Sequence, residues 1–233
     1  MNYPPEKILF LDIETVSAER NFKDLSENWQ QLWEEKTRYQ RKELSPEEFY
    51  PQRAGILAEF GRVVCISCGF LIPKGSFFEM RVKSFCQDDE RELLAAFADL
   101  LNQSFNRHYL CAHNGKEFDF PYLCRRMLVH QISLPGPLQI AGRKPWEVPH
   151  LDTMELWKFG DYKNYTSLKL LAALFGIPSP KEDIDGSMVG ATYWEEQDLP
   201  RIVEYCERDV ITLAEVCRRM LGWPEPIEPE IVD

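Results

Sequence analysis

An unbroken apolar run near the N-terminus, residues 8–11, leads directly into Asp12-Ile13-Glu14-Thr15. A fully apolar run predicts a strand that is covered on both faces of a sheet. Strand side chains alternate between the two faces, so Asp12 and Glu14 should point to the same side while Ile13 stays in the core. Two acids at the C-terminal end of a strand suit a hard divalent cation, although a strand that simply ends in a polar turn gives the same pattern.

Residues 18–58 change to a charged and aromatic sequence with helical spacing. Ser45-Pro46-Glu47-Glu48 is a capping box with proline at the first helical position, and it predicts the start of a short helix. We expect a helical insertion after the first strand, either a packed arm or a lid. The apolar face of its first helix consists of Leu25, Trp29, Leu32 and Trp33.

The rest of the chain alternates strands and helices. Residues 61–71 and 76–85 predict two strands joined by a short turn, hence a hairpin beside the first strand. A hairpin followed by strand–helix alternation predicts an α/β fold with a mixed sheet. The later elements are a helix that begins at Asp88 or Asp89, a short strand at 109–112, a helix at about 121–130, a strand end at 150–153, a helix at 168–175 and a long helix from Asp198 to about 221.

The length and composition indicate one globular domain. With 233 residues, of which 44% are hydrophobic, the chain can bury a sizeable core. We assign residues 1–222 to a single domain and residues 223–233, which are acidic and rich in proline, to an extended or disordered tail. The sequence contains neither a secretory segment nor an apolar run near the roughly 18 residues of a membrane span, which predicts a soluble cytoplasmic protein without a membrane partner.

Seven cysteines are scattered along apolar segments. Their odd number and scatter predict reduced, buried thiols rather than disulfides. Cys65 and Cys68 form a CxxC sequence, but a strand would place them on opposite faces. No second pair follows, which argues against a zinc site.

The formal net charge of −11 restricts the nucleic-acid partners that the chain can bind. Proteins that grip long duplexes through many phosphates are basic, because counterion release supplies most of their non-specific affinity. This chain should not coat DNA. A small site that captures one strand end through bound cations and a few local basic residues is compatible with the charge, because divalent ions locally reverse the sign of an acidic cleft.

A second acidic segment follows the predicted strand at 109–112. Asn114-Gly115 predicts a tight turn directly after this strand, and Asp119 precedes a helix start marked by Pro121. Taken alone, Asp119 is either a helix N-cap or a metal ligand.

The last predicted helix carries a phenol and a carboxylate on one flank. Tyr205 and Asp209 are four residues apart and stack beside the apolar stripe. Alone, such a pair is common on partly exposed helices. The stripe itself consists of Val203, Cys206, Val210, Leu213, Cys217 and Met220.

In this order, the three segments resemble the motifs of the DEDD superfamily of 3′→5′ exonucleases, in its tyrosine-bearing DEDDy branch. Residues 12–15 match the first motif, residues 114–122 the second and residues 205–209 the third. The chain is similar in particular to stand-alone proteins related to the proofreading exonuclease domain of family B DNA polymerases, over roughly residues 7–221. This resemblance implies a ribonuclease H-like mixed five-stranded sheet flanked by helices, with a helical insertion at about 18–58.

The resemblance also implies a chemistry. Two divalent cations, Mg²⁺ or Mn²⁺, would be held by Asp12, Glu14, Asp119 and Asp209, since cations offset the repulsion among four crowded carboxylates. Two such ions hydrolyse a phosphodiester by activating water and stabilising the leaving 3′-oxygen, which releases a nucleoside 5′-monophosphate. Tyr205 is expected to orient the water, because a phenol with a pKa of about 10 is a poor base at neutral pH.

Substrate contacts are also carried over from the resemblance. Thr15 and Val16 match positions that contact the terminal nucleotide, and Asn114 and Phe118 are expected to line the same pocket, with Phe118 stacking on a base. The structural alternatives are a strand-end hydroxyl for Thr15 and a core residue for Phe118. Asp152 matches none of the ligand positions, so we expect it to cap the turn that follows it.

Three functions fit the sequence. The first is a metal-dependent exonuclease on the 3′ ends of single-stranded DNA. The second has the same chemistry on RNA or short oligonucleotides, which contacts to the 2′-hydroxyl would decide. The third is a non-catalytic nucleic-acid-binding module, which is disfavoured because all four acids and the tyrosine are present.

Overall fold

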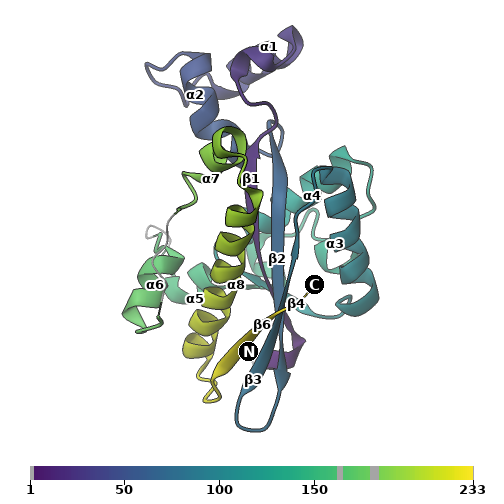
Figure 1. Ribbon diagram of the computed structural model, residues 1–233, viewed down its shortest axis with the longest axis vertical. Helices are drawn as coiled ribbons and strands as arrows, with labels where there is room; N and C mark the ends of the chain where they lie inside the picture. Colours follow the sequence, from purple (N-terminus) through teal and green to yellow (C-terminus); the bar gives the residue numbers. More distant parts are fainter. Residues whose placement is uncertain (1–2, 162–164, 179–183, 233) are drawn as a thin grey trace.

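The structure, a computed structural model, describes residues 3–161, 165–178 and 184–232. Its centre is one mixed sheet with the strand order β5-β4-β1-β2-β3-β6 (Figure 1). The predicted α/β class with a mixed sheet is confirmed, with six strands in place of the predicted five. The strands are β1 (Ile8–Ser17), β2 (Gly61–Pro73), β3 (Phe78–Phe85), β4 (Tyr109–Ala112), β5 (Leu151–Asp152) and β6 (Ile227–Ile231).

β1 lies in the middle of the sheet, antiparallel to β2 and parallel to β4. β2 and β3 form the predicted hairpin. Because Tyr109 pairs with Ile8 and the two strands run the same way, the turn that follows β4 begins beside Asp12. The register of β1 against β2 shifts between Glu14 and Thr15, so β1 becomes irregular directly after its acids.

Helices cover both faces of the sheet (Figure 1). α3 (Glu90–Ser104) and α4 (Asp119–Val129) pack on one face, whereas α8 (Leu199–Leu221) packs on the other, beside α5 (Thr153–Lys158) and α6 (Leu168–Leu174). Among the described residues, no helix combines the length and the apolar character that crossing a membrane requires. The remaining α-helices are α1 (Glu27–Thr37), α2 (Pro46–Arg53) and the short α7 (Val189–Ala191).

Alternation along β1 divides its side chains between two cores. Leu9, Leu11 and Ile13 pack with α3 and α4 in one core. Ile8 and Phe10 pack with α8 in the other. The next two side chains on the α8 side of the strand are those of Asp12 and Glu14. The alternation therefore directs both acids toward α8, although the strand and the helix are far apart in the sequence.

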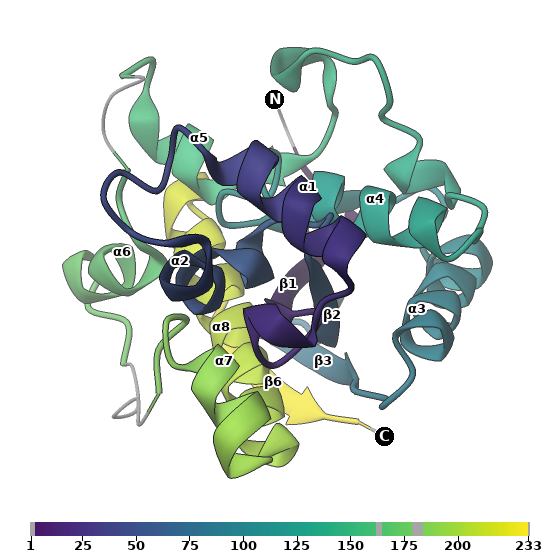
Figure 2. The same cartoon turned by 90° about the horizontal axis from the view of Figure 1, so that it is seen from above.

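The predicted insertion is helical, and α1 and α2 lie beyond the end of the sheet at which β1 finishes (Figures 1 and 2). Trp33 is fully buried, and its Nε1–H donates to the carbonyl of Pro46 at 2.9 Å. The predicted capping box opens α2. The predicted apolar face is only partly covered, because Trp29 and Leu32 are 44% and 41% exposed. The insertion therefore has a small core of its own and an apolar outer surface.

Part of the segment predicted to be an extended or disordered tail is a strand. Ile227–Ile231 pair in parallel with residues 78–82 of β3 and add the sixth strand at the edge of the sheet. Only Ile227 is buried, whereas the four residues after it are exposed. A sequence with one buried position and a proline lacks the alternation of a strand, although proline is tolerated on a sheet edge.

The seven cysteines are free thiols, as predicted, and five of them are buried. Cys65 and Cys68, the CxxC pair, both lie buried in β2. Burial raises the pKa of the Cys68 thiol to about 12, so this side chain is a neutral core residue and not a thiolate ligand.

Candidate functional site

Four carboxylates from three elements lie close enough around Asp12 for their charges to interact. Asp12 and Glu14 come from β1, Asp119 is the first residue of α4, and Asp209 lies in α8. Asp12 experiences the charges of the other three, so all four lie near one another. Glu14 and Asp119 are only 8% and 3% exposed. The fold thus brings together the four acids that the sequence predicted as a ligand set.

Burial and nearby acids raise the pKa values of three of these carboxyls, those of Asp12, Glu14 and Asp119. Burial is the larger cause for Asp12 and Glu14, whose pKa values lie well above their usual range, and the neighbouring acids raise them further. Burial raises the pKa of Asp119 to about 7, although hydrogen bonds from the backbone N–H groups of Asp119 and Ile13 act in the opposite direction. Ionisation of these carboxyls therefore costs free energy unless a cation binds beside them.

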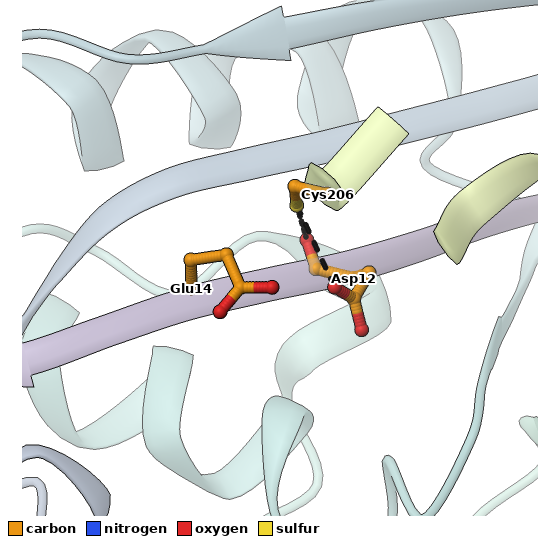
Figure 3. A group of neighbouring side chains, drawn as sticks. All are labelled: Asp12, Glu14 and Cys206. Atoms are coloured by element: carbon orange, nitrogen blue, oxygen red, sulfur yellow. Dashed lines mark hydrogen bonds between the residues drawn. The ribbon is translucent and has the colours of Figure 1, made fainter. Parts of the chain in front are cut away.

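A thiol lies against the two acids of β1. Ligand atoms of Asp12, Glu14 and Cys206 lie within 4.8 Å of one another (Figure 3). The Cys206 thiol donates to the backbone oxygen and to Oδ2 of Asp12, each at 3.5 Å. Burial raises the pKa of Cys206 well above its usual range, which keeps the thiol protonated and able to donate. The sequence placed Cys206 in the buried stripe of the last helix but gave no indication that it contacts Asp12.

Tyr205 stands on the same turn of α8 and points its phenol toward the acids. Burial raises the pKa of Tyr205 above its usual value, and the charges of Asp209, Glu14 and Asp12 raise it further. Its hydroxyl donates a hydrogen bond to the carboxylate of Asp209. The phenol is therefore neutral at physiological pH and holds its proton.

Thr15 and Val16 continue β1 beyond the acids. Val16 is 1% exposed and packs in the small core that contains Cys206, so its side chain belongs to the core and only its backbone can meet a ligand. The Thr15 hydroxyl is hydrogen-bonded to the phenol of Tyr122, which itself donates to the carbonyl of Gly55 at 2.7 Å. Thr15 is thus connected to the end of the helical insertion.

Asn114 and Phe118 belong to the turn between β4 and α4. Asn114 has a positive φ of 65°, a left-handed conformation that asparagine adopts more readily than most residues other than glycine. Phe118 is half-buried, packs against the core, and its ring is tilted at 49° to that of Tyr122 with 5.3 Å between the ring centroids. Phe118 is the N-cap residue of α4, so Asp119 is not the N-cap that the sequence offered as the alternative to a ligand.

Asp152 caps α5, as predicted, by accepting hydrogen bonds from the N–H groups of Met154 and Glu155. The same carboxylate also accepts from the N–H groups of Asn114 and Lys116 in the turn before α4. These long-range contacts were missed from the sequence, where Asp152 was assigned a local role alone.

Comparison with protein families gives one match over residues 56–221. The matching family is described as a predicted 3′-5′ exonuclease related to the exonuclease domain of PolB. The matched range includes α4 and α8, which carry Asp119 and Asp209, and begins after β1. None of the curated proteins matches the chain.

Among solved structures, the fold is similar to that of the family B DNA polymerase from the hyperthermophilic archaeon Pyrobaculum calidifontis. The similarity has a TM-score of 0.55 at 19% sequence identity and covers 91% of this chain. The chain spans 24% of the length of that polymerase, so the similarity concerns one part of a much larger protein. It supports the ribonuclease H-like form of the α/β fold.

Proposed function

Because the chain belongs to the family of predicted 3′-5′ exonucleases related to the exonuclease domain of PolB, we propose that it hydrolyses single-stranded DNA from the 3′ end and releases nucleoside 5′-monophosphates. The observation that carries this proposal is the convergence of Asp12, Glu14, Asp119 and Asp209 from three separate elements. Burial of several acids in one place is unfavourable for stability, and a two-metal nuclease site supplies a reason for it.

The donor set fits two hard divalent cations. All four groups are carboxylates, the ligands that Mg²⁺ and Mn²⁺ favour, and the pKa values of three of them, Asp12, Glu14 and Asp119, are raised by burial and by nearby acids, so their charged forms would gain from a bound cation. We assign Asp12, Glu14, Asp119 and Asp209 as the ligands. Bound there, the ions would lower the pKa of the attacking water and stabilise the leaving 3′-oxygen.

Tyr205 is assigned to positioning the water. Its phenol keeps its proton because burial and the acids raise its pKa, so it cannot act as a general base at neutral pH. The hydrogen bond to Asp209 fixes the ring beside the acids. The hydroxyl oxygen retains a lone pair that can accept a hydrogen bond from water and so direct it toward the phosphorus.

The terminal nucleotide is assigned to the surface formed by Thr15, Asn114 and Phe118, with Val16 contributing its backbone. Thr15 and Asn114 offer polar groups, and the partly exposed ring of Phe118 can stack on a base. These residues flank the acids along the chain, on β1 and on the turn before α4.

A single strand suits the surface better than a long duplex. The net charge of −11 disfavours a long phosphate-binding track. An exposed aromatic ring with a basic side chain over it can stack on a base while the basic group contacts a phosphate. Three such pairs occur: Arg38 with Tyr39, Lys144 with Trp146, and Lys158 with Tyr165. DNA is proposed because the similar structure is a DNA polymerase, and RNA or short oligonucleotides are the alternative.

The decisive experiment compares wild type with Asp12→Asn on 5′-labelled single-stranded DNA, single-stranded RNA and blunt duplex DNA, each with Mg²⁺ or Mn²⁺. We expect stepwise shortening of single-stranded DNA by wild type and none by the variant, because one ligand is lost. Glu207→Gln is the matched control, since Glu207 lies on α8 but accepts a hydrogen bond from Ser84 at 2.7 Å. Undiminished cleavage by Asp12→Asn would remove the mechanism, and faster cleavage of RNA would change the substrate.

A further inference from the structure

We propose that Asp152 is a positioning residue, whose carboxylate holds the turn before α4 in the conformation that brings Asp119 to the other three acids. It would act on the reaction without touching metal or substrate. The inference rests on the proposed function for its effect on catalysis, whereas its effect on the turn can be measured independently.

The contacts of Asp152 exceed those of a helix cap. Its Oδ1 accepts from the N–H groups of Met154 and Glu155 at 2.9 and 3.3 Å, which is ordinary capping of α5. The same oxygen accepts from the N–H of Asn114 at 3.0 Å, and Oδ2 accepts from the N–H of Lys116 at 3.1 Å. One carboxylate that is 3% exposed therefore joins two segments that are 36 to 38 residues apart.

The turn itself needs to be held. Asn114 adopts a positive φ of 65°, and Gly115 has no room for a side chain because a Cβ there would lie 2.4 Å from the Cβ of Ala112. The turn thus combines a left-handed residue with a close backbone approach. Asp152 accepts hydrogen bonds from the residues on either side of Gly115, Asn114 and Lys116, and so holds both sides of this turn in place.

Local hydrogen bonds transmit the position of the turn to Asp119. The N–H groups of Glu117 and Phe118 donate to the carbonyl of Asn114, and the N–H of Phe120 donates to the carbonyl of Gly115. These bonds start α4 at Asp119. A shift of Asn114 or Lys116 would therefore move the Asp119 carboxylate with it.

Side chains reinforce the same junction between the turn and α5. Lys116 Nζ pairs with Glu155 Oε2 at 2.8 Å. His113 bonds through Nδ1 to the hydroxyl of Thr153 at 2.8 Å and donates from Nε2 to the carbonyl of Thr166, also at 2.8 Å. α5 in turn contacts α8, which carries Asp209. Asp152 thus lies between the turn that positions Asp119 and the helix α5, which packs against the helix that carries Asp209.

Asp152→Asn is the sharpest test. Asparagine is an equally good N-cap, and its carbonyl oxygen can keep the bonds that Oδ1 makes, whereas its amide NH₂ cannot accept from Lys116. We expect kcat or the affinity for Mg²⁺ to fall by about 10- to 100-fold, the usual effect of losing a partner behind a metal ligand. Mg²⁺ affinity is read from the metal concentration that gives half of the metal-induced rise in melting temperature.

Ser167→Ala is the matched control, because Ser167 caps α6 through the N–H of Leu170 at 3.3 Å and makes none of the contacts of the turn. It should lower the melting temperature without changing kcat or Mg²⁺ affinity. Asp152→Ser, a capping side chain too short to reach Lys116, provides a second variant. Equal kcat and Mg²⁺ affinity in wild type and both Asp152 variants would overturn the proposal.

Amide hydrogen exchange separates this proposal from the proposed function. We expect faster exchange at Asn114 and Lys116 in both Asp152 variants than in Ser167→Ala, whether or not the wild type cleaves DNA. A wild type without nuclease activity but with this change in exchange would refute the reaction and keep the positioning role. Unchanged exchange at the two amides overturns the positioning role itself.

Discussion

The carboxyl of Asp119 makes the metal-free protein sensitive to pH. Its pKa is about 7 in the folded protein and 3.8 as an ordinary value, so the folded state binds the proton more tightly than the unfolded state. The stability from this group is present in full below about pH 4 and is lost as the pH rises to about 7. We expect the free energy of unfolding in EDTA to fall between pH 5 and pH 7.5, measured by urea titration.

Two comparisons isolate this effect. Asp119→Asn removes the titrating group, so its unfolding free energy should change less over the same pH range. Millimolar Mg²⁺ should reduce the loss at pH 7.5 in wild type, because the cation competes with the proton for the carboxylates. A pH dependence identical in wild type and variant would contradict the assignment to Asp119.

Tyr205→Phe keeps the buried ring and removes only the hydroxyl. Because the hydroxyl is assigned to orienting water, we expect kcat to fall by roughly 100-fold. The metal-induced rise in melting temperature should persist, since all four carboxylates remain. Tyr193→Phe, a half-buried tyrosine in the turn that follows α7, is the control and should retain wild-type kcat. Full activity of Tyr205→Phe would refute the role.

For individual residues, the sequence predicted those contacts that follow from the local geometry of a strand or a helix. Alternation along a strand placed Asp12 and Glu14 on one side, and the structure has them there. The contact of Cys206 with Asp12 spans 194 residues, and the contacts of Asp152 span 36 and 38. No local pattern encodes such distances, so both were visible only in the folded chain.

Among the elements, the edge strand β6 allows a test of whether the domain ends at residue 222, as the sequence predicted. Removal of residues 223–233 deletes the buried Ile227 side chain and leaves the edge of β3 open. We expect the free energy of unfolding to fall by about 2 kcal/mol or more, with increased self-association through the open edge. Urea unfolding and light scattering measure the two effects.

The activity of the shortened chain should remain at the wild-type level for each folded molecule, because β2 and β3 separate β6 from β1, the strand that carries Asp12 and Glu14. Ile227→Ala in the full chain is the control. It loses a similar apolar contact but keeps the strand, so it should be destabilised without increased self-association. Equal light scattering from both variants would contradict the edge argument.

Elements with strong end patterns or a clear apolar strand pattern were predicted well, whereas the edge strand β6 was not. Ser45 and Asp198 cap α2 and α8 as expected. β6 was missed because one buried residue among acids and a proline does not distinguish an edge strand from a tail. In α1 the helical spacing was correct for Trp29, Leu32 and Trp33, but Leu25, which was predicted on the same face, lies before the helix begins at Glu27. Trp29 and Leu32 remain partly exposed, because spacing reveals which residues share a face and not what covers it.

For the whole molecule, the net charge of −11 predicts a weak dependence of DNA binding on salt. An oligonucleotide with a non-hydrolysable 3′ end should bind with a slope of log K against log salt between about −1 and −3, since few phosphates are contacted. EDTA should weaken the binding. Fluorescence anisotropy measures both. A slope near −7, which corresponds to about ten phosphate contacts, would indicate an extended basic track.

The family match covers only part of the candidate site. The match begins at residue 56, whereas Asp12 and Glu14 lie on β1, between β4 and β2 in the middle of the sheet. A chain that began at residue 56 would lack the strand that joins the two halves of its own sheet. Topology of this kind, in which the first strand lies between later ones, follows from the packing of the whole chain, and the sequence predicted only that the hairpin lies beside the first strand.

The separation of β1 from α8 along the chain affects the order of events during protein synthesis. A ribosome makes β1 before α8, and Cys206 follows Asp12 by 194 positions, so α8 can dock on β1 only after this stretch has been made. Until then the nascent chain presents two of the four acids without Tyr205 or Asp209. Contacts of such long range also form slowly. Nuclease activity should therefore appear only after α8 has docked on β1.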